Sequence, residues 1–191
     1  VGGDYTDAGA TAVDDVDGKI TSSIQVTGGV NVNKPGVYTL SFNVKDTSGN
    51  AAATVNRTIT VADVVPPVIT LIGSKIITIP VGSNYTDAGA TANDDVDGEV
   101  TSFIEAKGEV NINKPGIYTI SFNVKDSSGN IAETVLRTIR VVDVIPPVIK
   151  LIGSMSITIT VGGDYTDAGA TAIDDVDGDV TFSIQSSGEV N

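Results

Sequence analysis

The 191-residue chain contains no cysteine, no histidine and no tryptophan. Without cysteine there are no disulfides and no thiol nucleophiles, and the chain fits either a cytosolic protein or an exported bacterial protein that does not rely on disulfides. Without histidine as well, ordinary zinc sites and histidine general bases are excluded. Aromatic residues make up only 5 % of the chain, which disfavours a sugar-binding platform of stacked rings.

Positive charge and long apolar runs are also scarce. Eleven lysines and arginines stand against 24 acidic residues, giving a net charge of −13. This balance argues against nucleic acid or an anionic membrane as partner and suits a soluble protein that binds cations. No apolar run is long enough to span a bilayer, and no signal peptide is visible. Since 40 % of the residues are hydrophobic, the chain can still bury a core.

The same sequence recurs along the chain, as VGGDYTDAGA at Val1, VGSNYTDAGA at Val81 and VGGDYTDAGA at Val161. Residues 1–80 and 81–160 are identical at 56 of 80 positions. A period this faithful, at about 80 residues, indicates a tandem array in which each repeat is one structural unit. The predicted domains are a partial repeat at 1–64, a complete repeat at 65–143 and a partial repeat at 144–191.

Apolar residues alternate with polar ones through the complete repeat, and Gly, Pro, Asn and Asp punctuate the runs. Residues 117–126 alternate most cleanly, with Tyr118, Ile120, Phe122 and Val124 predicted to point inward. No helical periodicity is present, so we predict an all-β fold of tandem immunoglobulin-like β-sandwiches with about seven antiparallel strands each. The runs are 68–72, 76–81, 90–92, 99–106, 109–113, 117–126 and 132–142.

Arg137 conflicts with this pattern, because it falls on the same face of the last strand as Val135, Ile139 and Val141. Either a bulge turns it outward, or it lies near the rim of the sandwich beside a carboxylate. We favour the rim.

Three phrases, KPGIYTISFNVKDSSGN, RTIRVVD and PPVI, resemble the immunoglobulin-like repeats of bacterial surface proteins, which are related in pattern to hyalin-type and cadherin-like repeats. The resemblance implies an exported tandem array at the bacterial cell surface. Such modules serve as stalks, adhesins, filament subunits and enzyme appendages, so the resemblance is specific for fold and weak for activity. It also implies that Tyr118 is the tyrosine of a tyrosine corner, although a plain core aromatic would fit equally well.

Each repeat carries an acidic loop, DDVDG, in which like charges repel one another. If successive strands form hairpins, this loop lies at the opposite end of its repeat from the KDSSGN loop (residues 125–130) and faces the next repeat across the linker. Clustered carboxylates there would call for a cation, and calcium suits them because it accepts six to eight oxygen ligands. The predicted ligands are Asp14, Asp15 and Asp17 with Asp63 and Asp126 at the first junction, and Asp94, Asp95 and Asp97 with Asp143 at the second.

Other interpretations of these acids stay open. Asp and Gly are common turn residues, so the loops could simply be solvated. The twelve-residue ligand spacing of an EF-hand is absent. Asp7, Asp87 and Asp167, in the recurring YTDAG, are as well placed to bond their own backbone as to bind metal.

Near-identical repeats favour a non-enzymatic structural segment, which the resemblance implies belongs to a bacterial cell-surface stalk, adhesin or extracellular filament, with its junctions stiffened by calcium. The alternative is a module of a secreted protein that binds carbohydrate or a receptor. Paired carboxylates can cleave glycosides, but here they repeat in every unit and lie in a turn, so an enzyme is not predicted. The expected partners are neighbouring repeats of the same longer chain, with other copies in a fibre as a further option, and neither nucleic acid nor membrane insertion is expected.

The two partial repeats lack opposite sets of strands. They indicate either a window on a longer array or completion of one molecule by another, head to tail. Residues 161–191 duplicate residues 1–31, and head-to-tail completion would leave the second copy without a place. We therefore expect the window.

Overall fold

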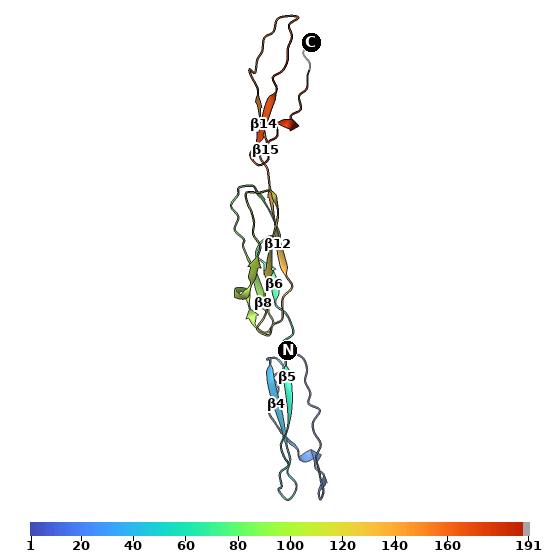
Figure 1. The fold of residues 1–191 in the computed structure, drawn as a ribbon. Helices are drawn as coiled ribbons and strands as arrows, with labels where there is room; N and C mark the ends of the chain where they lie inside the picture. Colours follow the sequence, from blue (N-terminus) through green and yellow to red (C-terminus); the bar gives the residue numbers. More distant parts are fainter. Residues whose placement is uncertain (189–191) are drawn as a thin grey trace. The chain divides into compact units, whose positions relative to one another are not determined.

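The computed structural model describes residues 1–188, which are built from β-strands, turns and three single turns of 3₁₀ helix (Figure 1). Residues 189–191, the end of the last predicted repeat, lie outside the described residues. Among those described, no helix is long and apolar enough to cross a membrane. The all-β prediction is confirmed, whereas the predicted repeat boundaries stay predictions.

The chain divides into two compact units, which are described separately. Unit 1 comprises Val1–Ile72, Gly89–Ala106 and Phe122–Val135, and unit 2 comprises Gly73–Ala88, Lys107–Ser121 and Leu136–Asn191.

The first repeat, in unit 1, consists of a small hairpin and a three-stranded antiparallel sheet. The central strand of the sheet buries Leu40 and Phe42. The hairpin is β1 (Val13–Asp14) with β2 (Gly18–Lys19), and the sheet, in the order β3-β4-β5, contains β3 (Gln25–Thr27), β4 (Gly36–Asn43) and β5 (Val55–Val61), with η1 (Thr21–Ser23) before it.

Unit 1 also contains the sheet that carries the second acidic loop. Its order is β6-β8-β9, and both pairs of strands are antiparallel. Leu71 lies opposite Ala90 and Val68 opposite Asn93, so the end of β8 is beside the beginning of β6 and the linker before it. The strands are β6 (Val68–Leu71), β8 (Ala90–Asp94) and β9 (Gly98–Glu99), followed by η2 (Thr101–Phe103).

A four-stranded sheet, lying mostly in unit 2, has the order β10-β11-β12-β7. β7 pairs with β12 in parallel, with Ile76 opposite Thr138 and Pro80 opposite Val142. This corrects the predicted hairpin between 68–72 and 76–81, because β6 pairs with β8 instead. The strands are β7 (Ile76–Pro80), β10 (Glu105–Lys107), β11 (Gly116–Asn123) and β12 (Val135–Val142).

The described part of the third repeat reproduces the β6-β8-β9 sheet. Leu151 lies opposite Ala170 and Val148 opposite Ile173, which is the register of the equivalent residues in the central repeat. Its elements are β13 (Val148–Leu151), β14 (Ala170–Asp174), β15 (Gly178–Asp179) and η3 (Thr181–Ser183).

Strand β11 has the predicted alternation, since Ile120 and Phe122 are buried. The hydroxyl of Tyr118 donates to the carbonyl of Lys114 at 3.0 Å, which is the bond expected of a tyrosine corner. The two strands predicted before β11, at 99–106 and 109–113, are wrong. Residues 99–106 fold as the end of β9, η2 and the start of β10, and residues 109–113 form no strand.

Arg137 lies on a regular strand and shares its buried face with Ile139 and Val141, so there is no bulge. Its side chain is fully buried. Nη1 pairs with Oδ1 of Asp87 at 2.5 Å, and Nε donates to the carbonyl of Ser74 at 3.1 Å. The predicted carboxylate beside Arg137 is therefore confirmed, whereas the side chain is fully buried and not at the rim. The same carboxylate accepts the hydroxyl of Tyr85 at 2.6 Å, and burial together with this bond raises the pKa of Tyr85 to about 12.

We expect Asp87→Ala to lower the free energy of unfolding of the central repeat by about 3–5 kcal/mol, because it removes the carboxylate that pairs with the buried Arg137 guanidinium. Amide exchange of β12 measures the loss. The matched control is Asp7→Ala in the first repeat, whose partner Arg57 has a side chain 38 % exposed. Water can solvate Arg57, so that loss should be much smaller. Equal effects of the two variants would contradict the argument from burial.

Candidate metal centre

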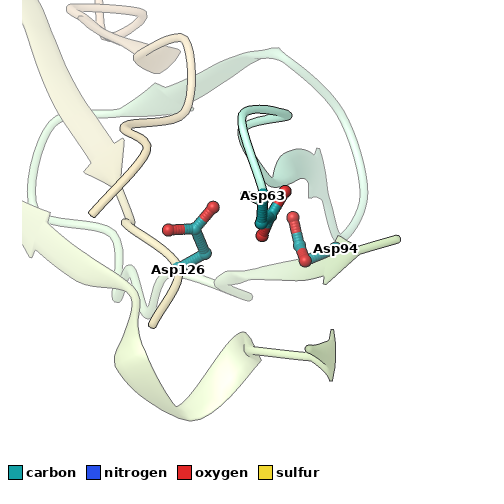
Figure 2. Close-up of side chains that lie close together, drawn as sticks. All are labelled: Asp63, Asp94 and Asp126. Carbon is teal, nitrogen blue, oxygen red and sulfur yellow. The ribbon is translucent and has the colours of Figure 1, made fainter. Parts of the chain in front are cut away.

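Three aspartates from three separate segments of unit 1 meet at one place (Figure 2). Asp63 lies in the linker after β5, Asp94 ends β8, and Asp126 lies in the KDSSGN loop between β11 and β12. One carboxylate oxygen from each lies within 4.8 Å of the others. The residues are only 7 %, 3 % and 6 % exposed, respectively. We call them the Asp63 group.

Backbone turns fix the first two carboxylates. Oδ1 of Asp63 accepts the N–H of Val65 at 3.2 Å. Oδ1 of Asp94 accepts the N–H groups of Val96 and Asp97, each at 2.9 Å. The glycine that closes this turn, Gly98, has φ +72°, a left-handed conformation that favours glycine. In each of these two carboxylates, Oδ1 accepts backbone hydrogen bonds and Oδ2 takes no part in the turn.

Asn130 fixes the third carboxylate. Its backbone N–H donates to Oδ1 of Asp126 at 2.7 Å, and its side-chain amide donates to Oδ2 at 2.6 Å. The same amide donates to the carbonyl of Asp63 at 3.3 Å, which joins the KDSSGN loop to the linker. Burial alone would raise the pKa of Asp126, but the hydrogen bonds from Asn130 and from the following backbone outweigh it and lower the pKa below its usual value. Asp126 is therefore held in its charged form.

The other oxygens of the first two carboxylates lack donors. Oδ2 of Asp63 and Oδ2 of Asp94 are both buried, and neither has a hydrogen-bond partner among residues 1–188. A buried polar atom without a partner is costly, and it is more so beside other carboxylates. A hard cation would satisfy both atoms and neutralise the repulsion. The ligand set contains only oxygen, which suits calcium.

The predicted meeting of Asp63 with Asp126 is confirmed, but the acidic loop assigned to them is wrong. Asp94 lies with the linker and the KDSSGN loop of its own repeat, whereas Asp14, Asp15 and Asp17 are not in the Asp63 group. The error follows from the assumed hairpin between 68–72 and 76–81. Because β8 runs antiparallel to β6, the acidic loop after β8 lies at the linker end of the repeat. The assumed hairpin had placed this loop at the opposite end.

Several predicted ligands have other surroundings. Asp17 and Asp97 accept hydrogen bonds from Thr47 and Ser127. Asp15 and Asp95 are exposed. Of the predicted ligands, the buried group contains Asp63, Asp94 and Asp126.

A second group of acids lies in unit 2 and consists of Asp143, Asp174 and Asp177, of which only Asp174 is buried. Asp143 was predicted as a ligand, but with Asp94, Asp95 and Asp97 rather than with these partners. Asp174 and Asp177 were missed, although Asp174 occupies the position of Asp94 one period later and the repeat points to it.

Asp46, which lies one period before Asp126, was not predicted as a ligand and belongs to neither group. It repeats both bonds to the asparagine that follows in its own loop, at 2.7 and 2.6 Å to Asn50. The hydrogen bond from the Asn50 side chain is the main cause that lowers the pKa of Asp46.

These sheets and the acids at their linkers define a class of protein: a tandem array of immunoglobulin-like β modules. A family model described as "Bacterial surface protein, Ig-like domain" matches residues 1–61, 69–141 and 149–191. The chain belongs to this family, and the predicted resemblance is confirmed.

Individual relatives share about a third or less of the aligned residues with this chain. An 81.3 kDa protein of Acholeplasma phage L2 is 33 % identical over 91 % of this chain and 24 % of its own length. The pesticidal crystal protein Cry22Aa of Bacillus thuringiensis is 33 % identical over 68 % of this chain and 18 % of its own length. Among solved structures, a lipoprotein of Bacteroides thetaiotaomicron is 25 % identical with a TM-score of 0.38, covering 42 % of this chain and 39 % of its own. The chain thus spans a quarter or less of these two curated relatives.

The unpartnered oxygens predict opposite effects of Asp63→Asn with and without calcium. Without calcium, the substitution removes one of three repelling charges and supplies an amide that can donate to Asp94. It should then stabilise the central repeat by about 1–3 kcal/mol. With saturating calcium it removes a ligand and should destabilise. Thermal unfolding in chelator and in calcium measures both signs, and destabilisation of the same size in both conditions would contradict the prediction.

Proposed function

We propose that the Asp63 group binds a calcium ion and that this ion stiffens the junction between the first and central repeats. The observation that carries the proposal is the pair of buried, unpartnered oxygens on Asp63 and Asp94. The chain holds these atoms in place with backbone hydrogen bonds to the other oxygen of each carboxylate. A site whose ligands are already fixed loses little conformational entropy when the ion binds.

The donor chemistry favours calcium over magnesium. Calcium takes six to eight oxygens in flexible geometry, so three carboxylates leave room for carbonyl groups and water. Magnesium demands near-ideal octahedral geometry and loses its water reluctantly. We expect a dissociation constant of about 10⁻⁴–10⁻³ M, the range of extracellular calcium modules.

The position of Asp63 gives the ion a mechanical role. Asp63 lies shortly after the end of β5 and shortly before the Pro66–Pro67 pair. An ion shared with Asp94 and Asp126 would fix the linker against two loops of the following repeat. The two prolines already restrict the backbone after Asp63, so the ion would fix the linker at Asp63 itself, just before them.

This role fits a non-enzymatic segment of a longer surface stalk, adhesin or extracellular filament. Such a spacer needs many copies of one module and a defined angle at each linker. Membership of the bacterial surface family supports a location outside the cell. The neighbouring repeats of the same chain are then its main partners.

Calorimetry and solution scattering on the 191-residue chain test the proposal. Calcium should bind and reduce bending between repeats, and chelator should reverse the change. The double variant Asp63→Asn with Asp94→Asn should lose both effects. The double variant Asp15→Asn with Asp95→Asn is the matched control, because both aspartates are exposed and the two substitutions remove an equal charge. Absence of calcium binding by the unaltered chain, or equal loss in the control, would reject the proposal.

The exposed aromatic ring of Phe103 favours a second candidate function, a module that binds carbohydrate. Phe103 is 67 % exposed and lines a hollow with Glu99, Lys125 and Ser127. An apolar ring beside polar side chains can stack against a sugar while they bond its hydroxyl groups. The equivalent residues of the other repeats are Ser23 and Ser183, so only the central repeat carries the ring at this position.

Phe103→Ser tests this candidate by placing the residue of the other repeats in the hollow. If the hollow binds sugar, the unaltered chain should be retained on a glycan array and the variant should not. The control is Phe182→Ser, which removes another exposed ring, 88 % exposed, from the third repeat. Retention that is unchanged by Phe103→Ser would exclude the hollow as the binding site.

A further inference from the structure

The carboxylate of Asp97 is bound to the residue that follows Asp126. Oδ2 of Asp97 accepts the backbone N–H of Ser127 at 2.6 Å, and Oδ1 accepts its hydroxyl at 2.8 Å. Asp97 lies in the acidic loop, three residues after Asp94. These two bonds therefore join the loop that carries Asp94 to the loop that carries Asp126. We call them the Asp97 clamp.

The first repeat contains the same clamp with a different partner. Asp17 accepts the backbone N–H of Thr47 at 2.8 Å and its hydroxyl at 2.8 and 2.9 Å. Serine has become threonine, yet the hydroxyl and both contacts are kept. The arrangement thus recurs in two repeats rather than arising from one local conformation.

The third repeat places the corresponding side chain differently. Its counterpart of Asp97 is Asp177. There, a carboxylate oxygen of Asp177 lies within 4.8 Å of those of Asp143 and Asp174. The same position can therefore place its charge among the other acids. In the central repeat the clamp directs that charge to Ser127 instead.

We infer that Asp97 is a positioning residue for the cation site, and not one of its ligands. The clamp holds the KDSSGN loop so that Asp126 faces Asp63 and Asp94, whose buried unpartnered oxygens point to a cation. Hydrogen bonds to a charged carboxylate are stronger than neutral ones, so the clamp is suited to fixing a loop. This inference rests on the proposed calcium site and names a residue that holds one of its ligands in position.

The loss expected from breaking the clamp is about tenfold or more in calcium affinity, which is the usual effect of removing an outer partner of a metal ligand. Asp97→Ala removes both bonds. Ser127→Ala removes only the hydroxyl bond and changes no charge, so it should cause a smaller loss. Ser127→Thr should keep the affinity, because threonine makes the same contacts in the first repeat. Calorimetry on the whole chain measures all three.

Two controls separate positioning from charge and from general stability. Asp95→Ala removes the same charge from an exposed neighbouring residue. Asp17→Ala breaks the equivalent clamp in the first repeat, away from the Asp63 group. Both should leave calcium affinity nearly unchanged. A loss with Asp95→Ala equal to that with Asp97→Ala would overturn the inference, since charge alone would then explain it.

Terbium in place of calcium distinguishes a positioning residue from a ligand. Its luminescence lifetimes in H₂O and D₂O give the number of bound waters, which should be the same in Asp97→Ala as in the unaltered chain. Additional bound water in the variant would make Asp97 a ligand and overturn the inference, as would an unchanged affinity. If the unaltered chain binds no calcium, the proposed function itself fails, which is a separate outcome.

Discussion

Mutual repulsion between buried carboxylates is the constraint on which this site depends. Asp63, Asp94 and Asp126 are each more than nine-tenths buried, and two of their oxygens have no donor. Charges so close in a partly dry environment cannot relax by turning into water. The backbone bonds that hold the other oxygens keep the arrangement in place, so a bound cation would relieve the repulsion at a site that is already formed.

The buried charge of Arg137 is neutralised by another residue of the chain, whereas the buried charges of the Asp63 group have only one another as near neighbours in that group. Arg137 is as deeply buried as the Asp63 group, but it has Asp87 as counter-charge and a carbonyl as second acceptor. That pair is complete whatever the solution contains. The Asp63 group contains only acids, so its stability should follow the concentration of calcium. One repeat thus combines a permanent ionic contact with a conditional one.

The site belongs to a repeat together with the linker that precedes it. Asp63 follows the last strand of one repeat, while Asp94 and Asp126 come from the next. The Asp97 clamp and Asn130 connect these segments further. In an array built this way, each additional repeat would bring two acids to the linker before it and would supply the linker acid of the next group. A longer chain would multiply the junctions without any new chemistry.

The sequence by itself determined the period, the all-β class, the alternation of β11 and the oxygen-only chemistry of the acids. These follow from local patterns, because strand faces depend on neighbouring residues and donor atoms on residue type. It did not determine which acids meet. Asp94 joins Asp63 because β6 pairs with β8, whereas β7 pairs in parallel with β12, which lies at the far end of the repeat in sequence. Only tertiary structure decides between a hairpin and such a pairing, since both satisfy the same local alternation.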